Sequence, residues 1–215
     1  MRLLELIELT ISNYSLKPIY VDRETDAEFF LLLKNRVLIL AFNGSNNFKD
    51  WKINLSLDLV NCDRSLNMCS VKDSIFKVHR GYCCCFNNLK SYVETYINRY
   101  IGLFDEIKII GHSSGGSVGN LFAYWLATVF NSISIKLYTF GSPPVADLKF
   151  VSISEDKYLH YRFYNLFDPT YFLFPKFLGY EDTGIAFSLF WLENPHHIDR
   201  FYINIKNSRL QKLIV

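Results

Sequence analysis

The sequence lacks features that mark several large classes of protein. It has no run of about 18 apolar residues, so no membrane-spanning helix is predicted. Its charges nearly cancel, with 23 Lys and Arg against 21 Asp and Glu, and neither end is strongly basic, so no nucleic-acid binding is expected. Repeats, low-complexity tracts and flexible linkers are also absent. A single domain over residues 1–215 is therefore expected.

Cysteine is scarce and arranged in a way that disfavours disulfides. The five cysteines are Cys62, Cys69 and the run Cys83–Cys85, an odd count with three adjacent members. A zinc site needs paired ligand spacings that this pattern does not offer, so no metal is expected. Free thiols indicate a reducing compartment. Because Glu5 and Glu8 interrupt the apolar N-terminal segment, no signal peptide is predicted, and an intracellular location is expected.

Apolar and aromatic residues are abundant. Half of the residues are hydrophobic, and 19 Phe, 14 Tyr and 3 Trp supply ample material for a core. Helical spacing of apolar residues predicts helices over 2–11, 81–100 and 114–130. Strands are predicted over 37–42, 76–79, 106–110, 133–140, 158–166 and 185–192, whereas 27–33 and 198–213 fit either a helix or a strand. The alternation predicts an α/β fold whose central, mostly parallel sheet carries helices on both faces, with chemistry at the carboxyl ends of the strands.

A candidate nucleophile lies at one such strand end. Residues 111–115, G-H-S-S-G, fit the pattern G-x-S-x-G directly between a predicted strand and a predicted helix. Glycines at both ends let the strand and helix approach closely while Ser113 takes a strained backbone conformation. Ser113 would also lie at a helix N-terminus, which favours negative charge. An ordinary glycine-rich turn is the alternative interpretation, but the pattern favours a nucleophile.

A serine nucleophile needs a histidine base and an orienting carboxylate, which follow it in the chain in this fold class. Downstream histidines are His160, within a strand pattern, and the adjacent loop pair His196 and His197. Asp168 stands out among the acids because it directly follows a strand and precedes a proline. The other acids at plausible positions are Asp147, Glu155, Asp156, Glu181, Asp182, Glu193 and Asp199.

Five sequence blocks together resemble the class 3 lipases, the fungal-type lipase family with an α/β-hydrolase fold. They are G-H-S-S-G-G from residue 111, A-F-N-G-S from 41 with D-W at 50 and N-L at 54, V-H-R-G-Y from 78, T-F-G-S-P from 139, and F-Y-N-L-F-D-P from 163. They occur in the family's order and cover about residues 38 to 170. The chain departs from the family in Asn43 and Pro144, which replace arginines, and in its short interval between Asp168 and the histidines.

The resemblance implies roles for several residues. Ser45 and the backbone N–H of Ser114 would form the oxyanion hole, and the segment 46–57 would lie over the site as a lid. The family's ending, H-x-[IM]-x-x-[YF], aligns best with His196, followed by Ile198 and Phe201. His196 is therefore preferred to His197 as the base.

The combined prediction is a serine hydrolase that cleaves carboxylic esters of lipids through Ser113, Asp168 and His196, as a triacylglycerol lipase, phospholipase or esterase. No cofactor is needed. Aromatic residues in 171–174 and 187–191 are candidates for an acyl pocket or for transient contact with a membrane or lipid interface. The alternative is a catalytically silent lipase-like protein that binds lipid or a partner. A thioesterase or peptidase would use the same triad.

Overall fold

The computed structural model describes residues 2–13, 15, 17–44, 58–62, 76–172 and 174–212. Its strands are β1 (Tyr20–Val21), β2 (Glu28–Lys34), β3 (Val37–Phe42), β4 (Leu59–Cys62), β5 (Phe76–His79), β6 (Glu106–His112), β7 (Ser134–Phe140), β8 (Leu159–Asn165) and β9 (Ile185–Leu189). Its α-helices are α1 (Leu3–Asn13), α3 (Arg80–Arg99), α4 (Ser114–Val129), α5 (Leu148–Ser154) and α6 (Ile198–Lys206). Short 3₁₀ helices are η2 (Pro169–Phe172), η3 (Lys176–Leu178) and η4 (Arg209–Lys212).

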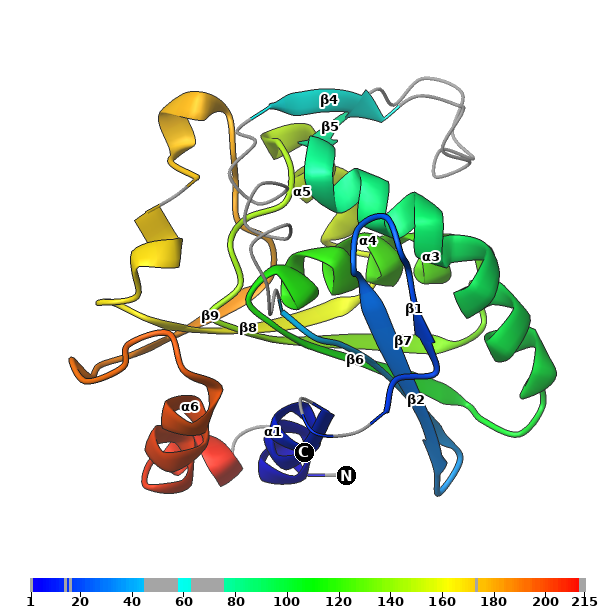
Figure 1. Cartoon of the computed structure of the whole chain (residues 1–215), viewed down its shortest axis with the longest axis horizontal. Helices are drawn as coiled ribbons and strands as arrows, with labels where there is room; N and C mark the ends of the chain where they lie inside the picture. Colours follow the sequence, from blue (N-terminus) through cyan, green and yellow to red (C-terminus); the bar gives the residue numbers. More distant parts are fainter. Residues whose placement is uncertain are drawn as a thin grey trace.

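Seven strands form one sheet in the order β1-β2-β3-β6-β7-β8-β9. Strands β3, β6, β7, β8 and β9 are parallel, and β1 and β2 extend the sheet antiparallel at one edge. Strands β4 and β5 form a separate antiparallel pair. Helices α3 and α4 cover one face, and α1 and α6 lie side by side on the other (Figure 1). The predicted α/β fold with a mostly parallel sheet is confirmed.

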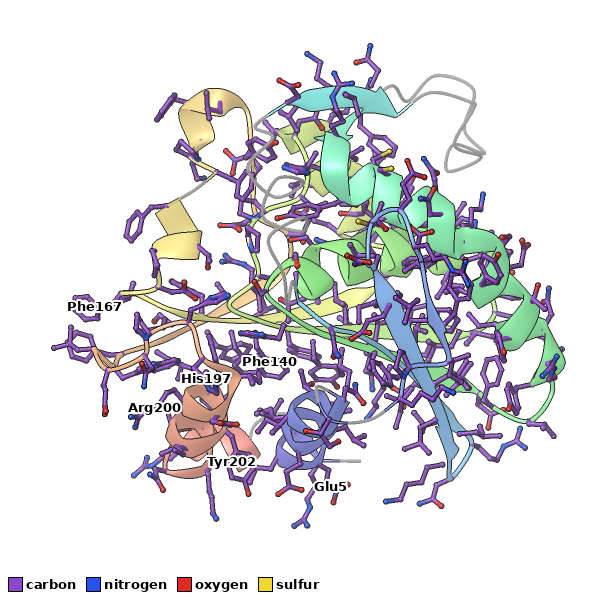
Figure 2. All side chains as sticks on the ribbon, in the orientation of Figure 1. Glu5, Phe140, Phe167, His197, Arg200 and Tyr202 are labelled. Atoms are coloured by element: carbon purple, nitrogen blue, oxygen red, sulfur yellow. The ribbon has the colours of Figure 1, made fainter. Side chains whose placement is uncertain are left out.

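Two hydrophobic cores hold the layers together. The larger core lies between the sheet and α3 and α4, where side chains such as Phe86 and Phe122 are fully buried. The smaller core joins the opposite face of the sheet to α1 and α6 through residues such as Ile7, Phe140 and Phe201. The N-terminal and C-terminal helices therefore share a single layer, and a hydrogen bond from Tyr202 to Glu8 links them at 2.8 Å. Figure 2 shows Tyr202 and Glu5 on these two helices, beneath the sheet.

The structure resolves the two segments that fit either a helix or a strand. Residues 28–34 form strand β2, which joins β3 through a tight turn at Asn35 and Arg36, both with φ between 50° and 59°. Residues 198–206 form helix α6 because its N-terminus is capped and one face packs into the smaller core. The short elements β1, β4 and α5 were not predicted from the sequence. None of the described helices is long and apolar enough to cross a membrane.

Candidate active site

Ser113 lies in the sharp turn between β6 and α4. Its backbone has φ 55° and ψ −135°, a strained conformation for a residue with a side chain. A Cβ on Gly111 would meet backbone atoms of Gly115 at 2.6 Å, and a Cβ on Gly115 would collide with the carbonyl oxygens of Phe42 and Asn43. The glycines thus permit the close approach of strand, helix and the end of β3 that holds Ser113 in this conformation.

A histidine and an aspartate reach Ser113 from later strand ends. His196 Nε2 lies 2.8 Å from the Oγ of Ser113, and His196 Nδ1 lies 2.6 Å from Oδ2 of Asp168. Asp168 follows β8 and is only 1% exposed, whereas the ring of His196 is partly exposed. The structure therefore brings the three candidate residues into one hydrogen-bonded chain.

The hydrogen bonds of Asp168 fix the protonation of the histidine ring. Its second oxygen, Oδ1, accepts hydrogen bonds from the backbone N–H and the hydroxyl of Thr170, at 2.9 and 2.7 Å. Because a carboxylate only accepts, the neutral ring of His196 carries its proton on Nδ1 and presents the lone pair of Nε2 to Ser113. Gly141 leaves room for the contact, since a Cβ there would approach Asp168 Oδ2 at 2.9 Å.

Two buried polar side chains anchor the loop that carries His196. Asn165, fully buried, donates from its amide to the carbonyls of Trp191 at 2.9 Å and Pro195 at 3.0 Å. His112 Nε2 lies 2.8 Å from the carbonyl oxygen of His196, so this nitrogen must be the donor. Burial and the neighbouring charge of His196 lower the pKa of His112 to about 3. A neutral donor thus holds the backbone of His196 without repelling a protonated ring.

A comparison with known protein families assigns the chain to one of them. Residues 39–176, more than half of the chain, match the family model described as Lipase (class 3). The chain belongs to the class 3 lipases.

Solved lipase structures share the fold of this class 3 lipase. A lipase from Rhizopus microsporus var. chinensis aligns with a TM-score of 0.67 and 23% identity, over 80% of this chain and 61% of that one. A triacylglycerol lipase from Penicillium expansum aligns with a TM-score of 0.75 and 17% identity, over 88% of this chain and 79% of that one. The native propeptide complex of Rhizomucor miehei lipase aligns with a TM-score of 0.66 and 22% identity, over 81% of this chain and 56% of that one. This chain thus spans about three fifths of the length of the Rhizopus lipase.

Of the two residues predicted to form the oxyanion hole, the structure describes Ser114 but not Ser45. Ser114 is the first residue of α4 and is buried directly beside Ser113. Its backbone N–H therefore belongs to the positive end of the helix dipole. Ser45 and the proposed lid, residues 46–57, lie outside the described residues.

The competing candidates form contacts elsewhere in the structure. His160 is buried between the hydroxyls of Thr139 and Thr183, each 2.8 Å away, and burial lowers its pKa to about 3. Asp182 pairs with Arg162 at 3.3 Å. None of these side chains touches Ser113.

His197 faces away from the triad. Its Nδ1 lies 3.3 Å from a carboxylate oxygen of Asp199 and accepts a hydrogen bond from the backbone N–H of that residue, which caps α6.

No cluster of metal-ligating side chains occurs within the described ranges, where Cys83 and Cys85 are buried and form no disulfide.

Sequence reasoning missed Thr170, His112 and Asn165 as parts of this site. The blocks around residues 111 and 163 contained His112 and Asn165, but their partners lie 84 and 30 residues away in the chain. Thr170 carried a local signal, because a threonine two residues after an aspartate is well placed to donate hydrogen bonds to its carboxylate.

Proposed function

We propose that this class 3 lipase hydrolyses carboxylic esters of lipids with Ser113 as nucleophile, His196 as general base and acid, and Asp168 as the orienting carboxylate. The observation that supports the proposal most strongly is the chain of two short hydrogen bonds through His196, 2.8 Å to Ser113 and 2.6 Å to Asp168. Such a chain provides the nucleophile, the base and the orienting group in the relative positions that acyl transfer requires.

The chemistry follows from the protonation state of His196. Its Nε2 takes the proton of Ser113 as Oγ attacks the ester carbonyl, and it then gives that proton to the departing alcohol. Water enters, loses a proton to the same nitrogen and attacks the acyl-enzyme carbonyl, which releases the carboxylic acid and restores Ser113. Asp168 stabilises the imidazolium that forms in each half-reaction.

The oxyanion formed at each attack needs fixed donors. The backbone N–H of Ser114 is the first proposed donor, and it lies at the N-terminus of the 16-residue helix α4. Ser45 is the second proposed donor. Loss of one such donor costs about 2.7–4 kcal/mol of transition-state stabilisation in enzymes of this type.

Exposed aromatic side chains near the site favour a lipid substrate that is presented at a surface. Phe167 directly precedes Asp168 and lies at the outer end of the sheet (Figure 2). Its ring packs edge-on against the ring of Phe190, with the two ring centroids 4.8 Å apart. Phe190 and Phe172 are 66% and 65% exposed. Exposing these apolar rings to water is unfavourable, and contact with a lipid interface beside the triad would cover them.

The proposal is tested with a tagged fluorophosphonate, which labels only an activated serine. We expect labelling at Ser113, no labelling of Ser113→Ala and full labelling of Ser152→Ala, which changes an exposed serine on α5. The same three proteins are assayed on p-nitrophenyl butyrate, where only Ser113→Ala should lose turnover. An unlabelled wild type with the same background rate as Ser113→Ala would support a silent lipid-binding or partner-binding protein instead.

The lipid-surface component has a separate test. Phe190→Ser should lower the rate on emulsified tributyrin and leave the rate on the soluble ester unchanged. Equal rates of wild type and variant on the emulsion would contradict contact through this ring.

A further inference from the structure

A hollow lies on the opposite face of the sheet from α4, beside α1. We define the α1 groove by the apolar side chains that form its walls, Leu9, Phe30, Leu32, Ile39, Ala41 and Ile110. Leu9 comes from α1, and the others come from strands β2, β3 and β6, next to which α1 lies in Figure 1. The cavity volume is about 480 Å³, within the range of about 300–1,000 Å³ that is usual for small-molecule sites.

Two polar side chains, Asn13 and Lys17, line the α1 groove. Asn13, the last residue of α1, is only 5% exposed and lines the groove, yet its side-chain amide makes no hydrogen bond to any described residue. Its amide atoms are not among the fully buried, unpaired polar atoms of the described residues, so they remain accessible to a ligand in the groove. Lys17 also lines the groove, is exposed to solvent and forms no ion pair with a described carboxylate.

The charge of the groove has one sign. Lys17 is the charged residue among its described lining residues, and no acidic side chain accompanies it. Its ammonium more than offsets the partial negative charge at the carboxyl end of α1, where Asn13 lies. An anionic head group therefore suits this end of the groove better than a cationic one.

We infer that the α1 groove binds a single-chain aliphatic carboxylate, a fatty acid. The carboxylate accepts hydrogen bonds from the amide of Asn13 and from the ammonium of Lys17. The alkyl chain lies along Leu32, Ile39 and the neighbouring apolar walls, which removes partly exposed apolar surface from water. The inference concerns binding only, and it does not depend on the proposed catalytic function.

Calorimetric titration of the intact protein with sodium decanoate, below the concentration at which it forms micelles, tests the inference. Lys17→Glu should weaken binding at least about tenfold, because an attractive contact becomes repulsive. Lys149→Glu makes the same charge change on an exposed residue of α5 and should leave the affinity unaltered. Equal weakening by both variants would indicate a net-charge effect and overturn the assignment.

A second variant separates ligand binding from a structural role. Asn13→Leu removes the amide at similar volume, so it should weaken decanoate binding without lowering the melting temperature. A lower melting temperature with unchanged binding would show that Asn13 serves the fold instead. If 1-decanol binds as tightly as decanoate and Lys17→Glu has no effect on either ligand, the carboxylate assignment is wrong.

The position of the ligand has its own readout. A diazirine-bearing fatty acid, activated by light and mapped by peptide mass spectrometry, should label residues 30–32 or 39–41. Labelling confined to peptides outside the α1 groove would refute the site even if decanoate binds the protein.

Discussion

Replacement of Asp168 by Asn isolates the part of the site that sets the protonation of His196. In the native site Oδ2 accepts from His196 Nδ1 while Oδ1 accepts from both donors of Thr170. An asparagine keeps one accepting oxygen, and the backbone N–H of Thr170 requires it, because a donating NH₂ there would face another donor at 2.9 Å. The new NH₂ therefore points at His196.

The consequence is the wrong tautomer at the base. With a donor facing Nδ1, the imidazole must carry its proton on Nε2, and that nitrogen then has no lone pair for Ser113. The loss of turnover should approach about 10⁴-fold, the value measured for the same change in a serine protease triad, which corresponds to about 5 kcal/mol of activation free energy. KM should change little, because Asp168 is buried behind the ring and does not face the substrate.

The assay is steady-state hydrolysis of p-nitrophenyl butyrate, with circular dichroism and a melting curve to establish that the variant folds. Asp182→Asn and Asp199→Asn are matched controls, since each makes the same change in an aspartate closer to His196 along the chain. Both should retain activity within about threefold. If Asp168→Asn stays within tenfold of wild type, or if Asp182→Asn loses activity instead, the tautomer argument fails.

Two further predictions concern the histidines. His196→Ala should lose at least about a thousandfold in kcat on a soluble ester, whereas His197→Ala should keep its rate and lose about 1 kcal/mol of stability, because His197 caps α6; the reverse ranking would move the base to His197. Burial lowers the pKa of both His112 and His160 to about 3, so each stays neutral in the folded chain while the unfolded chain takes up a proton below about pH 6.5. Stability should therefore fall as the pH falls, by roughly 2 kcal/mol per histidine at pH 5. Urea unfolding at pH 7.5 and pH 5 measures the loss, which His160→Gln should reduce; equal unfolding free energies for the wild type at the two pH values would contradict it.

Local patterns predicted the long elements and the serine turn. The turn at Ser113 could be predicted because its requirement is local, as two glycines must flank a strained residue between a strand and a helix. Long helices such as α3 can be predicted from their periodic apolar residues. Strand β4 and helix α5 escaped because they are short, and α5 depends on Asp147, which caps the helix by accepting from Phe150 N–H rather than taking part in the candidate site.

Contacts between residues that are distant in the chain leave no local sequence pattern from which they could be predicted. The sequence left 27–33 and 198–213 open between helix and strand, because an apolar run alone does not tell which surface it will meet. Pairing with β3 determines the first, and packing against α1 determines the second. The same limit hid the support that Asn165 and His112 give to the loop of His196, since their residue types are equally common in unrelated roles.

The short interval between Asp168 and His196 is accounted for by how the chain returns to the site. A crossover between parallel strands needs only about a dozen residues, and residues 166–184 connect β8 to β9 through the 3₁₀ turns η2 and η3 without an α-helix. After β9, six residues reach His196, and their path is held by Asn165 at Pro195 and by His112 at the carbonyl of His196. Helix α6 then starts at once and packs against α1. The short return thus places His196 beside Ser113, because buried hydrogen bonds from His112 on β6 and Asn165 on β8 hold the backbone of its loop.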